Sequence, residues 1–96
     1  MAKAKLYTDI NYQGRTVDIT SDITDLTTIE FNDKVSSVIV ESGTFTLYSD
    51  VLFQGYSVTL SSKGGPSNDG KYPSYVFLGG LNDYFSSIRV NSVEPK

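Results

Sequence analysis

The sequence predicts an all-β domain: a sandwich of two Greek key motifs, with about eight antiparallel strands in two sheets. Apolar and polar residues alternate with a period of two through most of the 96 residues. Val, Ile, Thr, Tyr and Phe dominate these runs, and Gly and Asx residues separate them. A chain of this length buries one core rather than two, so we expect a single domain over residues 1–96.

An internal repeat predicts how this domain is divided. Residues 6–21 align without gaps on residues 47–62, at an offset of 41 positions. Each copy is typical of a strand, a tight aromatic-Gln-Gly turn and a second strand, followed by a looser connection. We therefore expect Greek key 1 over about residues 3–42 and Greek key 2 over about residues 43–93, four strands each. Two stacked sheets would let the keys share one core.

The two connections differ in length. Residues 21–31 form the compact first connection, which we expect to bring Leu26 and Phe31 into the core. Residues 62–81 form a longer second connection with a loop rich in Gly, Ser and Asn. Residues 75–78 then fit the third strand of the second key, although the same residues also suit a helical turn. Lys3 and Lys5 indicate an edge strand protected by charge.

Composition argues against several classes of function. The chain has no Cys and no His, which removes thiolate sites, the usual zinc ligand and the Ser-His-Asp triad. With no nucleophile elbow or phosphate-binding Gly loop either, we expect no enzymatic activity. A net charge of −3 argues against a nucleic-acid partner, and no apolar run is long enough to span a bilayer, so no membrane partner is expected. No signal peptide is evident, and the compartment stays open.

Two pairs of motifs carry a resemblance to a known family. Each hairpin has an aromatic-x4-aromatic-x-Gly pattern, at Tyr7, Tyr12 and Gly14 and again at Tyr48, Phe53 and Gly55. Each connection ends in Asn-Asp-x-x-Ser-Ser, at residues 32–37 and 82–87. In this order and number, the motifs resemble the βγ-crystallin superfamily over essentially the whole chain. The resemblance is closest to its single-domain, calcium-binding members of microbial and other non-lens type.

The resemblance implies two Ca²⁺ ions, each held by oxygen atoms from both keys. It assigns carboxylates to Asp33 and Asp83, hydroxyls to Ser36 and Ser86, and backbone carbonyls to Ile10, Lys34, Val51 and Tyr84. Calcium takes about six to eight such hard oxygen ligands. With one carboxylate from each motif, we expect an affinity on the order of micromolar to sub-millimolar.

The remaining polar residues of the two motifs have simpler interpretations. Asn32 and Asn82 are expected to tie the turn through Asx hydrogen bonds, and Ser37 and Ser87 to satisfy the strand backbone. A turn followed by backbone-bonded hydroxyls also describes each whole motif without any metal. Two copies, each after its own aromatic hairpin, favour the calcium interpretation.

The sequence therefore predicts a calcium-binding structural or stress-related protein, monomeric, in which calcium stabilises the fold. The alternative is a β-sandwich recognition module for carbohydrate or protein, with calcium only structural. The four aromatic residues of the hairpin motifs, which fold back over the keys, are expected to pack in the core. Tyr56, Tyr72 and Tyr75 are freer, and they are the candidates for a partner surface.

Overall fold

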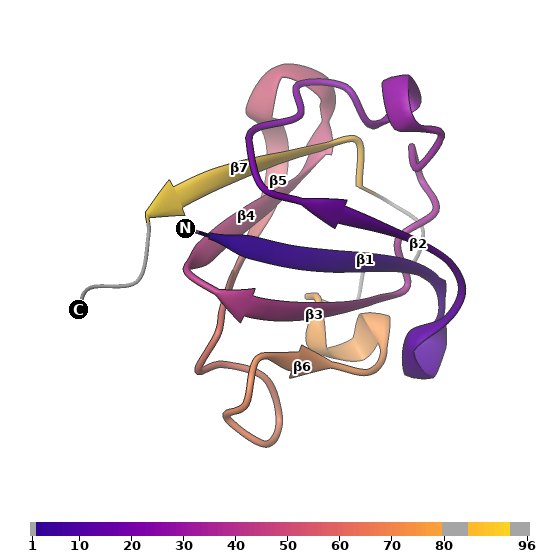
Figure 1. Cartoon of the computed structure of the whole chain (residues 1–96). Coiled ribbons are helices and arrows are strands. Elements are labelled where there is room, and N and C mark those ends of the chain that lie inside the picture. The colour runs from indigo at the N-terminus through magenta and orange to yellow at the C-terminus, as the bar shows by residue number, and fades with distance from the viewer. Residues whose placement is uncertain (1, 80–84, 93–96) are drawn as a thin grey trace.

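The computed structural model describes residues 2–79 and 85–92, and in these ranges the fold is all-β (Figure 1). The strands are β1 (Lys3–Asp9), β2 (Gln13–Ile19), β3 (Ser37–Ser42), β4 (Thr44–Asp50), β5 (Gln54–Ser61), β6 (Lys71–Tyr72) and β7 (Ser87–Ser92). Four short 3-10 helices join them: η1 (Ile10–Tyr12), η2 (Leu26–Ile29), η3 (Val51–Phe53) and η4 (Tyr75–Phe77). The predicted all-β class is confirmed.

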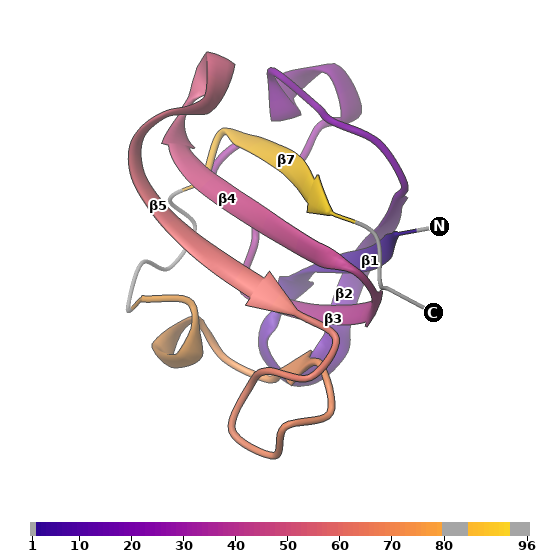
Figure 2. The ribbon, with the colours of Figure 1, turned by 90° about the vertical axis from the view of Figure 1, so that its left-hand side faces the viewer.

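The strands form two antiparallel sheets packed face to face. One sheet has the order β2-β1-β3-β6, and the other has the order β5-β4-β7. Figure 2 shows the second sheet stacked over the first. Since β1 is paired on both sides, by β2 and by β3, the predicted edge position of Lys3 and Lys5 is wrong. Both lysines instead pair with Asp18 of β2, at 3.7 Å and 2.8 Å.

The two hairpins are built with the same register. In the first, Leu6 pairs with Val17, and in the second Leu47 pairs with Val58, 41 positions later. The bulge before the turn recurs as well, at residues 7–9 and 48–50. In both turns the two residues before the Gln have positive φ, between 57° and 61°, and the glycine after the Gln has φ of about 80°. The repeat in the sequence is thus a repeat in backbone conformation.

Each half of the chain donates a segment to the sheet of the other half. β6, from the second connection, pairs with β3 through Val38 and Tyr72. Ile23, from the first connection, forms an isolated bridge with Ile88 of β7. This bridge occupies the place of an eighth strand, and the described residues contain seven strands. Neither sheet is complete without the other half.

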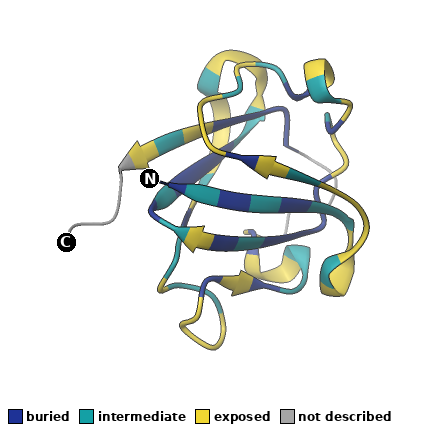
Figure 3. Cartoon of the chain, in the orientation of Figure 1, coloured by how far each residue is buried: buried dark blue, intermediate teal, exposed yellow. Residues whose placement is uncertain are grey.

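A single core fills the space between the sheets, and Figure 3 shows buried residues alternating with more exposed ones along strands such as β1. The fully buried side chains of largest volume are Phe45, Phe85, Leu6, Ile19, Leu26, Leu47, Leu60, Leu78 and Ile88. Phe31 is also buried, as predicted, and Ile29 packs against the cluster. No side-chain nitrogen or oxygen buried within the described residues lacks a hydrogen-bond partner.

The second connection differs from the strand predicted at residues 75–78. Tyr75–Phe77 forms η4, in agreement with the alternative of a helical turn, and the strand lies earlier, at Lys71–Tyr72. Ser74 explains the difference, because its hydroxyl accepts a hydrogen bond from the Val76 backbone at 3.3 Å and caps the turn. None of the helices in the described ranges has the length and apolar character needed to cross a bilayer.

Candidate metal centre

The last serine of the first motif fixes the turn of the first hairpin. The Ser37 hydroxyl donates to the Asp9 carbonyl at 2.6 Å and accepts from the Tyr12 backbone N–H at 3.0 Å. Its side chain is fully buried. These two contacts lie on either side of Ile10. Ser37 therefore fixes the conformation of the turn that contains the Ile10 carbonyl, a predicted calcium ligand.

Ser87 fixes the second hairpin in the same way. Its hydroxyl donates to the Asp50 carbonyl at 2.6 Å and accepts from the Phe53 backbone at 3.1 Å. Ser87 is also fully buried, and its contacts bracket Val51. The prediction that both terminal serines satisfy backbone groups is confirmed.

Backbone hydrogen bonds hold each motif against residues from elsewhere in the chain. The Asp33 N–H donates to the Phe85 carbonyl at 2.8 Å, which joins motif to motif directly. Ser36 donates its N–H to Tyr7 of β1, and Ser86 donates its own to Tyr48 of β4. Asp33 has a left-handed backbone, with φ of 55°, which Asp adopts more readily than most residues. The first motif therefore lies beside Phe85 and Ser86, in the described part of the second motif.

One predicted ligand from each motif meets across this junction. The Ser86 hydroxyl oxygen lies 3.5 Å from the Asp33 Oδ1 atom, although the residues are 53 positions apart. Two ligands at about 2.3–2.6 Å from one calcium ion are at most about 5 Å from each other. The separation of Asp33 and Ser86 fits a shared ion, and the oxygen chemistry of the pair fits calcium.

Asn32 contributes to the same cluster in a way that differs from the prediction. Its Nδ2 atom lies 3.3 Å from the Asp33 Oδ2 atom, so the amide donates to the carboxylate rather than to the turn backbone. The two carboxylate oxygens of Asp33 thus have different neighbours, the Asn32 amide and the Ser86 hydroxyl. This arrangement orients Oδ1 toward the second motif.

The other predicted ligands differ in their surroundings. Ile10 and Val51 are 46% and 40% exposed in turns η1 and η3, and because their side chains have no oxygen atom only their backbones could serve. Lys34 is exposed, and its N–H donates to the Phe31 carbonyl at 3.2 Å. Ser36 is buried. Asp83 and Tyr84, together with Asn82, lie outside the described residues.

The donor set is poor in charge. Within residues 2–79 and 85–92 there is no group of three or more His, Cys, Asp or Glu side chains that could hold a metal. Among the described residues, the oxygen donors of the two motifs beside the Asp33 carboxylate are hydroxyls and carbonyls. This is the ligand balance of calcium rather than of zinc.

The hairpin aromatics do not pack in the core as predicted, because the four rings are half-buried and lie outside the core cluster. Tyr7 and Tyr12 form an edge-on pair at 5.7 Å, and Tyr48 and Phe53 form a tilted pair at 5.6 Å. Tyr72, predicted to be free, is 6% exposed, because its ring joins the core and its hydroxyl accepts from the Ser61 backbone at 3.0 Å. The assignment of Tyr72 to a partner surface was wrong.

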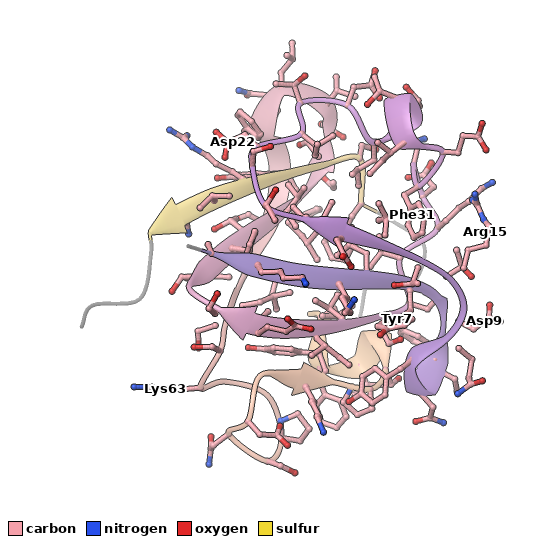
Figure 4. All side chains as sticks on the ribbon, in the orientation of Figure 1. Tyr7, Asp9, Arg15, Asp22, Phe31 and Lys63 are labelled. Carbon is pink, nitrogen blue, oxygen red and sulfur yellow. The ribbon has the colours of Figure 1, made fainter. Side chains whose placement is uncertain are left out.

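Two side chains outside the motifs tie segments that are distant in sequence, and no sequence pattern predicted these contacts. The Asp22 carboxylate accepts a hydrogen bond from the Val90 backbone at 2.7 Å, which ties the first connection to β7. The Arg15 guanidinium, labelled with Asp22 in Figure 4, donates to the Glu30 carbonyl at 2.6 Å. Both contacts join segments distant in sequence, so only the folded arrangement identifies them.

Comparison with known proteins agrees with this architecture. The sequence matches the Beta/Gamma crystallin family over residues 3–90. It is 37% identical over 89 residues to a beta/gamma-crystallin of Ciona intestinalis, covering 93% of this chain and 98% of the relative. The vertebrate γ-crystallins that it resembles are longer, and it spans only 43% to 47% of their length.

Solved structures give the same result. The fold is similar to that of a beta gamma crystallin from Ciona intestinalis, with a TM-score of 0.83 and 36% identity over 93% of this chain and 99% of the other. It is also similar to a βγ-crystallin from an archaeon, with a TM-score of 0.76 and 30% identity over 93% and 96% of the two chains. The chain therefore belongs to the Beta/Gamma crystallin family.

Proposed function

We propose that this domain is a non-enzymatic structural protein that binds two Ca²⁺ ions and is stabilised by them. The observation that carries the proposal is the 3.5 Å approach of the Ser86 hydroxyl to the Asp33 carboxylate. One oxygen ligand from each half meets there, at a junction formed only in the folded chain. Asp33 and Ser86 would hold one ion together, with backbone carbonyls of the second half. By the symmetry of the repeat, Asp83 and Ser36 would hold the other.

The proposal predicts a large effect of calcium on stability. A ligand that binds only the folded state adds about 2.7 kcal/mol when its concentration is about 100 times its dissociation constant. In a domain of this size, each kcal/mol raises the melting temperature by roughly 4–8 °C. We expect saturating calcium to raise the melting temperature by roughly 10–20 °C over the value in chelator.

Titration calorimetry with CaCl₂, combined with thermal melts in calcium and in chelator, tests this proposal. We expect two ions per chain and a clear upward shift in melting temperature. MgCl₂ is the matched control, because magnesium loses its water less readily and demands a stricter geometry. Absence of both heat and shift with calcium would contradict the proposal.

The pairing of ligands can be tested separately by a double-mutant cycle. Asp33→Asn and Ser86→Ala should weaken the same ion, so their combined effect should be smaller than the sum of the separate effects. Asp33→Asn and Ser36→Ala should weaken different ions and act more nearly additively. Equal additivity in the two cycles would contradict the shared ion of Asp33 and Ser86.

A second candidate function is a recognition module for carbohydrate or protein, with calcium only structural. One observation favours it: the Tyr56 side chain is 72% exposed beside a shallow hollow that it lines with Ser49, Asp50 and Gly55. An exposed aromatic ring next to a carboxylate and a hydroxyl suits a sugar. A glycan screen in which Tyr56→Ala abolishes binding would promote this candidate.

A further inference from the structure

Arg15 occupies a position that differs chemically between the two hairpins. It follows Gly14 at the start of β2, and its backbone N–H donates to the Thr8 hydroxyl at 3.0 Å. Tyr56 follows Gly55 at the start of β5, and its N–H donates to the Ser49 hydroxyl at 2.9 Å. The two backbones are fixed alike, so the difference between the halves lies in the side chains.

The Arg15 side chain reaches the segment that leads into the first motif. One guanidinium nitrogen donates to the Glu30 carbonyl at 2.6 Å, and another lies 3.6 Å from the Glu30 carboxylate. The guanidinium carbon lies 5.1 Å from the centre of the Phe31 ring. Figure 4 shows Arg15 and Phe31 side by side. A planar, multiply donating cation suits this combination of contacts, and lysine does not reproduce it.

The residues that Arg15 contacts set the course of the chain into the motif. Glu30 ends η2 in the left-handed conformation, with φ of 60°, and Phe31 is anchored in the core at 2% exposure. The Phe31 carbonyl then accepts the N–H of Lys34. Asp33, between them, is itself left-handed and bonded to the second motif. Arg15 therefore contacts Glu30 and Phe31, the residues at which this series of turns begins.

Resting on the calcium binding proposed above, we infer that Arg15 is a positioning residue for the first motif. It holds residues 30–34 in the conformation that the ion requires, without contacting the ion. In the proposed sites, the first motif supplies the Asp33 carboxylate to one ion, and the Lys34 carbonyl and the Ser36 hydroxyl to the other. The binding of both ions should therefore depend on how Arg15 positions this motif. A loop ordered in advance loses less conformational freedom when it binds.

The charge of Arg15 and its role as a support predict opposite changes in calcium affinity when Arg15 is replaced. This difference makes the inference testable. Removing a cation near a calcium site would by itself strengthen calcium binding. Removing a support of the ligand loop would weaken it, and loss of such outer supports typically costs metal sites about 10-fold or more in affinity. The direction of the change therefore separates the two effects.

The experiment is a calcium titration of Arg15→Met, Arg15→Lys and the wild type, below the melting temperature of every variant. We expect about 10-fold weaker binding for Arg15→Met. A smaller loss of affinity is expected for Arg15→Lys, which keeps the positive charge but lacks the planar guanidinium with its several N–H donors. Tyr56→Ala, at the equivalent position of the second hairpin, is the matched control and should change the affinity by less than about two-fold. Unchanged or tighter binding by Arg15→Met would overturn the inference.

Amide hydrogen exchange of the calcium-free protein supplies an independent reading. In Arg15→Met, the N–H groups of Asp33 and Lys34 should exchange faster while those of β1 and β4 keep their protection. Equal acceleration throughout the chain would indicate general destabilisation and overturn the positioning role. A wild type that binds no calcium would refute the proposed function instead. If Arg15→Met does not fold, Arg15→Lys decides by the same two measurements.

Discussion

The two halves of this molecule share a hairpin and differ in the connection that follows it. Paired residues of β1–β2 recur in β4–β5 at an offset of 41 positions, whereas the serines that fix the turns, Ser37 and Ser87, are 50 positions apart. The second connection is therefore nine residues longer. It forms a two-residue strand, β6, where the first connection contributes only the Ile23 bridge.

The contacts of the two halves follow this division. The hairpins have the same serine ties, aromatic pairs and strained turns. The connections have different caps, an Asp25 carboxylate for η2 and a Ser74 hydroxyl for η4. Substitutions of residues that the two hairpins share should therefore have equal effects in the two halves, and substitutions in the connections should have unequal effects.

The largest expected effects come from the central strands. Leu6 of β1 and Leu47 of β4 are equivalent and fully buried, and each Leu→Ala change should cost about 2–5 kcal/mol of unfolding free energy. Urea denaturation measures both. Thr16→Ala, exposed on the first hairpin, should cost less than about 0.5 kcal/mol. A difference of several kcal/mol between the two leucine variants would break the equivalence of the hairpins.

Ser37→Ala and Ser87→Ala should have the next largest effects. Each removes a buried hydroxyl that bridges a carbonyl and an N–H of its hairpin turn. Leaving buried backbone groups without partners costs roughly 1–3 kcal/mol. We expect losses of similar size in the two variants, measured by urea denaturation in chelator. Destabilisation of only one variant would contradict the prediction that the two serine hydroxyls stabilise their turns equally.

The equivalence of the hairpins could be predicted from the sequence because the same residue types recur in the same order in both copies. Alternating strands, a glycine at positive φ and a serine within reach of the turn occur in both copies. The meeting of the two motifs was expected from the family resemblance, which implies that each site is built from both keys. The Asp33–Ser86 approach agrees with that prediction.

The connections could not be predicted to the same depth, because they do not repeat and because competing local signals and individual tertiary contacts decide them. The aromatic and β-branched residues at 75–77 favour a strand, but Ser74 caps a helical turn there. Tyr72 is buried because its hydroxyl reaches the backbone of Ser61, eleven positions earlier. The contact of Arg15 with Glu30 likewise depends on how β2 faces the end of η2. No period or motif encodes such distances.

The smallest expected effect is a difference between the two connections in how their stability depends on pH. The Asp25 carboxylate accepts hydrogen bonds from the Thr27 hydroxyl at 2.6 Å and the Thr27 backbone at 2.9 Å. These bonds, the hydroxyl first, hold the pKa of Asp25 below its ordinary value. Its contribution to stability is therefore present above the pKa of the unfolded chain and is lost as the pH falls through the lower folded pKa. The cap of η4 comes from the Ser74 hydroxyl, which does not titrate in this range.

Asp25→Asn isolates this contribution, because Asn is a comparable cap that carries no charge. The wild type should melt slightly above the variant at pH 7, and the gap should close below about pH 4 as Asp25 gains its proton. All other titrating groups are common to the two proteins, so the difference in melting temperature reports on Asp25 alone. A gap that stays constant from pH 7 to pH 3 would show that the charge of the cap contributes nothing. The two connections would then differ in length and contacts but respond alike to acid.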